Sequence, residues 1–305
     1  MGKKFLLRLM PCNTGGKRIV DISGALYTAV GIDQDGYAWV FGQGSLTPTK
    51  ITHDTTGAPF TGNVSCAGYF GTYTTIRSDG SIWSWGDDAW GLTGGKKMSL
   101  PVKLQMPAGV SFQKIVAANI LIALATNGDV YTYSGNGGKP VKIALPGPAA
   151  DVAGSHTGFY IATVGGYPYG WGAEYIYLGC SSQITTPVAL KTIWGLTAPI
   201  SRIVCNHNAI HFIDIQGRLF GMGDNAEGDV GNGSELVNHA EIYKPSAYPA
   251  ARMYAWSWAK YGMMISKPVQ IAPGTFFKDI WTGNSFAFYH YAIDTHDSLY
   301  SWGRG

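Results

Sequence analysis

The stretch 78-SDGSIWSWGDDAWG-91 holds the pattern that decides the fold. Asp79-Gly80 is a strong hairpin-turn dipeptide, because both residue types tolerate a positive φ. Trp83 and Trp85 follow two residues apart, so on a strand both side chains point to the same face. Such a pair of rings favours either a platform that stacks on a sugar or a packed core. The rest of the chain distinguishes these two interpretations.

The turn-and-aromatic pattern occurs six times if single departures are allowed. In each copy a bulky residue, almost always aromatic, stands three and five positions after the turn residue. Ser134 replaces the last glycine of the third copy, and Asp297 replaces the first glycine of the sixth. The copies are DGYAWVFG (35–42), DGSIWSWG (79–86), NGDVYTYS (127–134), GGYPYGWG (165–172), QGRLFGMG (216–223) and HDSLYSWG (296–303). A repeat of roughly 50 residues suits the blades of a β-propeller.

Each copy predicts a unit of four strands. Two short apolar segments precede the turn, as in RIVDISG (18–24) and YTAVGIDQ (27–34). A segment with an early Pro and alternating apolar residues, such as TPTKIT (47–52), follows it, and Pro is tolerated on an edge strand. Five such segments join six units. The segment KKFLLRLMP (3–11) has the same rhythm, and we expect it to add the outer strand of the last unit and close the ring.

These features resemble those of β-propellers built from regulator-of-chromosome-condensation repeats. The matching parts are the DG..W.WG turn, the (T/K)PV.(L/I) linker, the GSHTGFYIAT segment (154–163) with His156, and the tail GDNAEGDVGNG (223–233). The resemblance implies one closed all-β propeller over residues 1–305 with about six four-stranded blades, whereas the best-known members have seven. It also implies protein recognition, because members serve as exchange factors for small GTPases, as inhibitors of enzymes or as adaptors.

The composition excludes several classes of protein. Charged residues make up only 13% of the chain while Gly numbers 42, which favours a turn-rich all-β protein. The net charge of +3 has no long run of one sign, so we expect no nucleic-acid partner. No segment approaches the length of a membrane span, and no signal peptide is recognised at the N-terminus. We therefore expect that the protein is made in the cytoplasm. This expectation also fits a component of a virus particle that is made in the cytosol of a host.

No metal or cofactor is expected from the sequence. The four cysteines, Cys12, Cys66, Cys180 and Cys205, form no C-x-x-C pair, so buried reduced thiols are expected. The chain contains no P-loop, G-x-S-x-G, H-E-x-x-H or calcium-loop motif.

The recurring aromatic pair answers the opening question. Rings that return at the same phase in every unit are what a wedge between neighbouring sheets requires. We therefore predict that the tryptophans of the pattern are core residues and not a sugar platform. They are Trp39, Trp83, Trp85, Trp171 and Trp302.

One insertion, residues 234–266, breaks the repeat between the fifth and sixth copies. Loops of this length inside a repeat protein are usually functional or disordered, and this one is too aromatic for disorder. Aromatic and Met clusters mark binding surfaces, but the same rings could also form a cap on the propeller. Both interpretations stay open. The candidate binding residues are Tyr243, Tyr248, Arg252, Tyr254, Trp256, Trp258 and Tyr261.

The sequence leaves three functions to compare. The favoured one is a non-enzymatic binding module that recognises a protein partner through the loops and the insertion. The alternative is a virion or cell-surface attachment protein that binds a glycan or a host receptor. An enzyme, such as a polysaccharide lyase or hydrolase, would need paired carboxylates or a set of Tyr, His and Arg. The loop carboxylates that could serve it are Asp87, Asp88, Glu174, Asp224 and Glu227.

Overall fold

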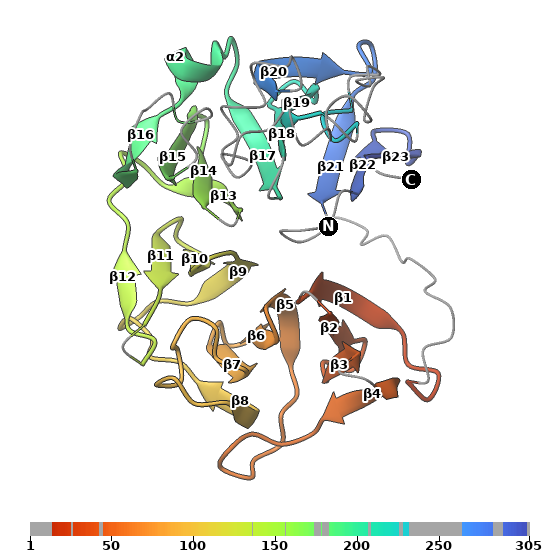
Figure 1. The fold of residues 1–305 in the computed structure, drawn as a ribbon, viewed down its shortest axis with the longest axis vertical. Coiled ribbons are helices and arrows are strands. Elements are labelled where there is room, and N and C mark those ends of the chain that lie inside the picture. The colour runs from red at the N-terminus through yellow and green to blue at the C-terminus, as the bar shows by residue number, and fades with distance from the viewer. Residues whose placement is uncertain are drawn as a thin grey trace, which may run out of the picture. The chain divides into compact units, whose positions relative to one another are not determined.

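Antiparallel strands account for almost all of the secondary structure in the computed structural model, and Figure 1 shows them as separate small sheets. The structure describes residues 14–303 apart from 26, 43–44, 136, 156, 174–177, 179–182, 207–208, 226–227, 232–263 and 283–288. Over these residues there are six sheets, five of four strands and one of three. The chain divides into two compact units, Met1–Ile143 and Ala144–Gly305, with three sheets in each.

The first unit contains the first three sheets, each built from strands that are consecutive in the chain. The first sheet consists of β1 (Ile19–Gly24), β2 (Thr28–Asp33), β3 (Ala38–Gly42) and β4 (Ser45–Ile51). The second consists of β5 (Asn63–Tyr69), β6 (Thr72–Arg77), β7 (Ile82–Gly86) and β8 (Met98–Lys103). The third consists of β9 (Phe112–Ala117), β10 (Leu121–Ala125), β11 (Val130–Tyr133) and β12 (Pro140–Lys142).

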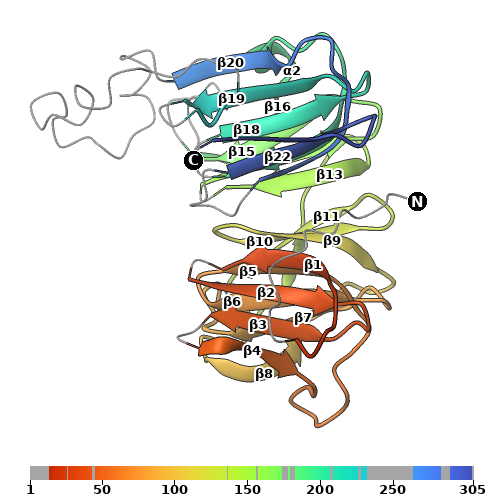
Figure 2. The same cartoon turned by 90° about the vertical axis from the view of Figure 1, so that its right-hand side faces the viewer.

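The second unit repeats this arrangement, and Figure 2 shows β18, β19 and β20 running side by side. The fourth sheet consists of β13 (Ala149–Gly154), β14 (Gly158–Thr163), β15 (Pro168–Gly172) and β16 (Ile184–Ala189). A short helix, α2 (Lys191–Trp194), follows it. The fifth sheet consists of β17 (Ile200–Cys205), β18 (Ala209–Asp214), β19 (Leu219–Asp224) and β20 (Met264–Ile271). The sixth sheet consists of β21 (Phe277–Thr282), β22 (Tyr289–Asp294) and β23 (Leu299–Gly303).

The predicted four-strand unit is confirmed in the first five sheets. Each Pro-containing linker forms the outermost strand of its sheet, for example β4 with Pro48 and β8 with Pro101. The sixth sheet has three described strands, and its predicted fourth strand, residues 3–11, lies outside the described residues. Because β20 pairs with β19, the insertion joins the third and fourth strands of the fifth sheet, and residues 264–266 belong to β20.

The hairpin at Asp79-Gly80 shows why this dipeptide recurs. Gly80 has a φ of +79°, and a Cβ atom there would lie 2.5 Å from the Cβ of Ser111. The Asp79 carboxylate accepts hydrogen bonds from both the backbone N–H and the hydroxyl of Ser81. Trp83 Nε1 then donates to the same Ser81 hydroxyl at 2.9 Å. The turn residues therefore fix both the chain reversal and the first of the two indole rings.

The tryptophans are core residues, as predicted. Trp39, Trp83, Trp85 and Trp171 are buried, and Trp302 is half-buried. Trp83 and Trp85 belong to one apolar cluster with Val30 of the first sheet, so they fill the boundary between the first and second sheets. We call each such boundary between consecutive sheets a seam. The sugar-platform interpretation of the opening stretch is therefore wrong.

Acidic side chains at the first strands tie neighbouring sheets together. Asp21 on β1 accepts a hydrogen bond from the backbone N–H of Cys66 on β5 at 2.9 Å. Asp151 on β13 accepts one from the backbone N–H of Ile203 on β17 at 3.0 Å. In both cases the carboxylate follows a register shift in its own strand. The shift turns the side chain toward the next sheet, where it satisfies a backbone donor.

Two further expectations concern single features. Cys66 and Cys205 are buried reduced thiols, as predicted, while Cys12 and Cys180 lie outside the described residues. In the described part of the chain, no helix is long and apolar enough to cross a membrane.

Candidate functional site

The structure describes the strands on either side of the insertion but not its candidate binding residues. β19 ends at Asp224 and β20 begins at Met264, and these two residues pair in the antiparallel ladder. Gly223 and Ile265 pair next to them. The strands that flank the insertion therefore pair with each other at one end of the fifth sheet. The residues outside the described part are Tyr243, Tyr248, Arg252, Tyr254, Trp256, Trp258 and Tyr261.

The chain folds tightly as it leaves β19, in a turn formed by Asn225 with Gly228–Gly231 that we call the root turn. The Asn225 side-chain oxygen accepts a hydrogen bond from Val230 N–H at 3.1 Å, and its carbonyl accepts one from Gly228 N–H at 3.2 Å. The Val230 side chain is fully buried. The glycines suit this turn because Gly228 and Gly231 have φ angles of +74° and +75°, and Asn225 suits it because its side-chain oxygen accepts a backbone hydrogen bond. The chain that leads toward the insertion is thus ordered against the fifth sheet as far as Gly231.

Two histidines meet beneath the root turn. His211 is on β18 and His290 is on β22, and both are fully buried. Their ring centroids lie 4.4 Å apart. The indole of Trp302, on β23, stacks on His290 at 5.6 Å and meets His211 edge-on at 5.3 Å. The Asn206 amide lies 3.5 Å from His290 Nε2. This cluster is the buried polar part of the fifth–sixth seam.

Trp302 connects the histidines to the root turn. Its Nε1–H donates to the carbonyl oxygen of Asp229 at 3.0 Å and to His211 Nε2 at 3.3 Å. Gly231 allows this approach, because a Cβ atom there would lie 2.7 Å from Trp302 Nε1, and its φ is +75°. The sixth sheet therefore holds the root turn through one indole and one close glycine contact.

Burial keeps the two imidazoles uncharged at neutral pH. It lowers the pKa of His290 from 6.5 to about 4. For His211, burial first and then the neighbouring His290 ring hold the pKa well below 6.5. The Asp229 carboxylate is also fully buried, and its Oδ1 lies 3.6 Å from His290 Nε2, which is longer than a hydrogen bond. Desolvation of the charged ring outweighs the attraction of this carboxylate.

The described carboxylates of the enzyme hypothesis have structural partners. Asp87 pairs with Lys97 at 2.6 Å, and Asp88 accepts hydrogen bonds from the backbone N–H groups of Thr93 and Gly95. Asp224 is buried at the end of β19. Glu174 and Glu227 lie outside the described residues. Among the residues that the structure describes, no three His, Cys, Asp or Glu side chains are placed to hold a metal ion.

The histidine pair was missed in the sequence. Reading along one strand pairs His211 with His207, four residues earlier, but His207 lies outside the described residues. The structure instead brings His211 to His290 of the next sheet. The feature of the sequence that could have indicated the pair is that both histidines lie in the second strand of their sheets. The equivalent positions of the other sheets carry aliphatic residues, Phe, Tyr or Thr.

Comparison with solved structures identifies the architecture. Human WBSCR16 superposes with a TM-score of 0.72 at 15% identity, over 94% of this chain and 77% of that one. Yeast RCC1 (Prp20) in complex with Kap60 gives 0.67 at 15% identity, over 94% and 70%. Prp20p from Saccharomyces cerevisiae, in a study of its binding to Gsp1p and histones, gives 0.67 at 16% identity, over 94% and 72%.

This chain has the fold of an RCC1-like β-propeller. It has six blades, of which the last has three described strands, so the predicted fold class is confirmed. Family models and curated proteins yield no match to the sequence. The root turn repeats the hydrogen bonds that Asp88, Gly91 and Thr93 make after β7, whereas the buried histidine pair departs from the repeat.

Proposed function

We propose that this RCC1-like propeller is a non-enzymatic binding module, which recognises a protein partner through its loops and the aromatic insertion. The fold supports this proposal, because solved propellers of this kind include Prp20 bound to Kap60 and Prp20p studied for its binding to Gsp1p and histones. Such a fold presents loops on a rigid frame, and the loops determine the partner.

The observation that carries the proposal is the contrast between the regular frame and the insertion. Five linkers form the outer strands of their sheets, and one of them is preceded by an aromatic segment of about thirty residues. The ladder pair Asp224–Met264 brings together the strands on either side of that segment. A segment whose flanking strands are paired loses less conformational entropy on binding than a free chain, and Tyr, Trp and Arg are the residues that dominate protein interfaces.

The deletion of residues 237–263 is the direct test. Because Asp224 and Met264 are ladder partners, the shortened chain can still connect β19 to β20. We expect an affinity pull-down from the native source, read by mass spectrometry, to enrich at least one protein with the intact chain and to lose it with the deletion. A partner retained in full by the deletion variant contradicts the assignment of the site.

Point substitutions separate recognition from loop length. Trp256→Ala and Trp258→Ala remove aromatic rings from the insertion, while Asn238→Ala and Glu241→Ala are matched changes of polar residues in the same segment. Loss of a buried aromatic anchor typically weakens an interface by about 2 kcal/mol or more. We expect binding to weaken with the tryptophan variants and to persist with the polar ones. Equal binding by all four variants would place recognition elsewhere on the propeller.

The attachment hypothesis is a separate outcome of the same experiment. If neither the intact chain nor the deletion variant enriches a protein, a glycan array with the intact chain tests binding to a surface carbohydrate. A positive array with a silent pull-down overturns protein recognition and favours the glycan or host-receptor alternative.

A further inference from the structure

The histidine pair occupies a position that recurs in every seam described within the two units. In each sheet the second strand ends where the hairpin to the third strand begins. The backbone N–H of its last residue donates a hydrogen bond across that turn, as from Asp214 to the Arg218 carbonyl and from Asp294 to the Ser298 carbonyl. Three residues earlier the side chain faces the next sheet, and four residues earlier it faces the preceding one. His211 and His290 are these two positions in the fifth and sixth sheets.

The equivalent pairs in the other seams carry no ionisable imidazole. They are Val30 with Tyr73, Thr74 with Leu121, and Tyr160 with Ile210. Val30 and Tyr73 lie in one apolar cluster, and Tyr160 and Ile210 lie in another. All six side chains are buried. Replacing such a pair by two histidines places groups that can take up a proton near neutral pH at a point where the other pairs have none.

The contacts of the pair depend on its charge. Trp302 Nε1–H can only donate a hydrogen bond, so its contact with His211 Nε2 needs a lone pair on that nitrogen. A doubly protonated His211 has no such lone pair. With both rings charged, two cations would also face each other at a centroid distance of 4.4 Å inside the protein, where charges are poorly solvated. The Nδ1 atoms of both rings have no hydrogen-bond partner among the described residues.

The structure also shows the groups that would stabilise a charged imidazole. The Asp229 carboxylate faces His290 from the root turn, and the backbone carbonyls of Asp229 and Val230 face His211. Each of these would favour a charged ring. The Asn206 amide and the Trp302 indole, which complete the surroundings from β17 and β23, carry no charge. Burial of both rings outweighs the favourable groups, since both histidines are held in the neutral form at neutral pH.

We propose that His211 and His290 form an acid-sensitive joint, at which protonation of the pair separates β22 and β23 from the root turn. The fourth–fifth seam, whose equivalent pair is Tyr160 with Ile210, does not respond to protons in this way. The inference goes beyond the binding function and does not depend on it, because it concerns a conformational change of the frame.

Hydrogen exchange read by mass spectrometry tests the joint in the intact chain. Exchange is measured at about pH 7.5 and about pH 4.5, with each rate corrected for the intrinsic pH dependence of amide exchange. One imidazole whose pKa rises from about 4 to 6.5 on opening favours the open state on the order of 50-fold at the lower pH. We expect an increase of this order in β22, β23 and the root turn, and a change of a few fold at most in β14.

Variants decide whether the histidines cause the difference. The double variant H211Y/H290I copies the pair of the fourth–fifth seam and should abolish the increase. His290→Gln is a milder change that cannot take up a proton, and it should remove most of the increase if the double variant does not fold. His53→Gln alters an exposed histidine of the first unit and should leave the increase unchanged.

Two outcomes overturn the proposal. An equal acid response in β14 and β22 would show general acid loosening of the second unit. An undiminished response in His290→Gln would show that other groups take up the protons.

Discussion

The two faces of the fifth sheet are built from the same strands but differ in chemistry. On β18, every residue from Ala209 to Asp214 is buried, so the strand contributes side chains to two seams in alternation. Ile210 and Phe212 join the apolar cluster shared with the fourth sheet. His211 faces the sixth sheet and meets His290. A shift of one residue along a strand thus separates a seam that depends on packing from one that also depends on protonation.

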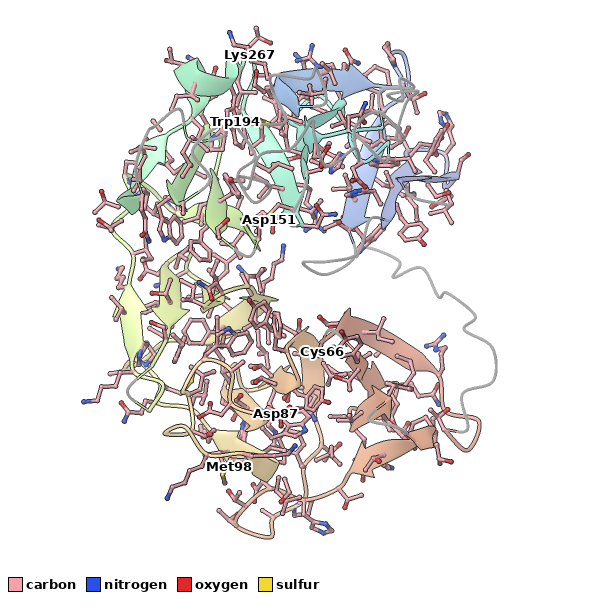
Figure 3. All side chains as sticks on the ribbon, viewed as in Figure 1. Cys66, Asp87, Met98, Asp151, Trp194 and Lys267 are labelled. Carbon is pink, nitrogen blue, oxygen red and sulfur yellow. The ribbon has the colours of Figure 1, made fainter. Side chains whose placement is uncertain are left out.

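Where the second strands β14 and β18 face each other, the fourth–fifth seam is aromatic and apolar. Trp194, at the end of α2, stacks on Phe212 at 5.7 Å, and Tyr160 lies 5.9 Å from the same indole. Figure 3 labels Trp194 and Asp151, which lie on α2 and β13 of the second unit. None of these aromatic contacts changes with protonation between neutral and mildly acidic pH. This seam is therefore the internal reference for the histidine-containing one.

The largest effect is expected for Trp194→Ala. The indole is buried at 2% exposure and contacts two rings, so its removal leaves a cavity in the fourth–fifth seam. We expect the free energy of unfolding to fall by about 3–5 kcal/mol, by the same amount at about pH 7.5 and pH 4.5. Urea unfolding at both pH values measures this. Trp281→Ala, at an indole with 39% exposure, is the matched control and should cost about 1 kcal/mol or less.

The second effect is the pH dependence of the intact chain. The folded-state pKa of His290 is about 4, below the 6.5 of an unfolded chain, so the unfolded state binds more protons between these values. The neutral histidine contributes fully above about pH 6.5, and its contribution is lost as the pH falls toward 4. The loss is on the order of 3 kcal/mol for this group. Urea unfolding of the intact chain and of His290→Gln, repeated across this pH range, measures the loss. It is the difference between the two proteins in how the free energy of unfolding changes with pH.

Carboxylates do not produce a loss of stability in the same pH range. The pKa of Asp79 is lowered from 3.8, mainly by the hydrogen bond from the Ser81 side chain, and that of Asp129 mainly by the Lys142 side chain. Stability from such groups is present above pH 3.8 and is lost as the pH falls further, through the folded pKa. A stability loss confined to the region below pH 4, and unaltered in His290→Gln, would contradict the role of the histidine.

The fold was predictable from the sequence because its signals are local. A turn such as Asp79-Gly80 followed by Trp83 and Trp85 fixes a hairpin and the face of its second strand within eight residues. Six copies of that pattern then give the number of sheets. The early Pro of each linker marks the outermost strand, as β8 with Pro101 shows. Each of these signals lies within one strand or one turn.

The histidine pair was not predictable, because it depends on the alignment of two sheets. His211 and His290 meet only if the second strands of the fifth and sixth sheets, β18 and β22, are aligned so that these two positions face each other. The periodicity of one strand does not determine that alignment. The link between Asp151 and Ile203 N–H was missed for the same reason, since it requires the register shift in β13. The assignment of the insertion as the binding site stays a prediction.

The third effect concerns the carboxylate that joins the first strands of the fourth and fifth sheets, β13 and β17. Asp151 is buried at 1% exposure and accepts backbone N–H bonds from Val152 and Ile203, both at 3.0 Å. Asp151→Ala leaves these donors without the carboxylate, which costs about 2 kcal/mol. Urea unfolding measures the loss, and faster amide exchange at Ile203 locates it. Asp21→Ala makes the same change at Cys66 N–H in the first unit, and it should leave exchange at Ile203 unaltered.

The smallest effect is expected at the ion pair that joins β17 to β21 in the fifth–sixth seam. Arg202 Nε donates to Asp279 Oδ1 at 3.1 Å, and the two side chains are 37% and 32% exposed. Partly exposed pairs contribute little, so Arg202→Met should cost about 1 kcal/mol at low ionic strength. In about 1 M salt, where screening acts within about 3 Å, most of that difference should disappear.

The salt dependence distinguishes the two carboxylates near Arg202. Its Nη1 lies 3.9 Å from the buried Asp151 carboxylate, so the guanidinium could act mainly on that charge and not on Asp279. A buried charge is screened much less by salt, and leaving it without its cation costs about 3 kcal/mol or more. A large, salt-independent loss in Arg202→Met would therefore contradict the surface-pair interpretation. It would also show that the fourth–fifth seam depends on a buried charge at Asp151.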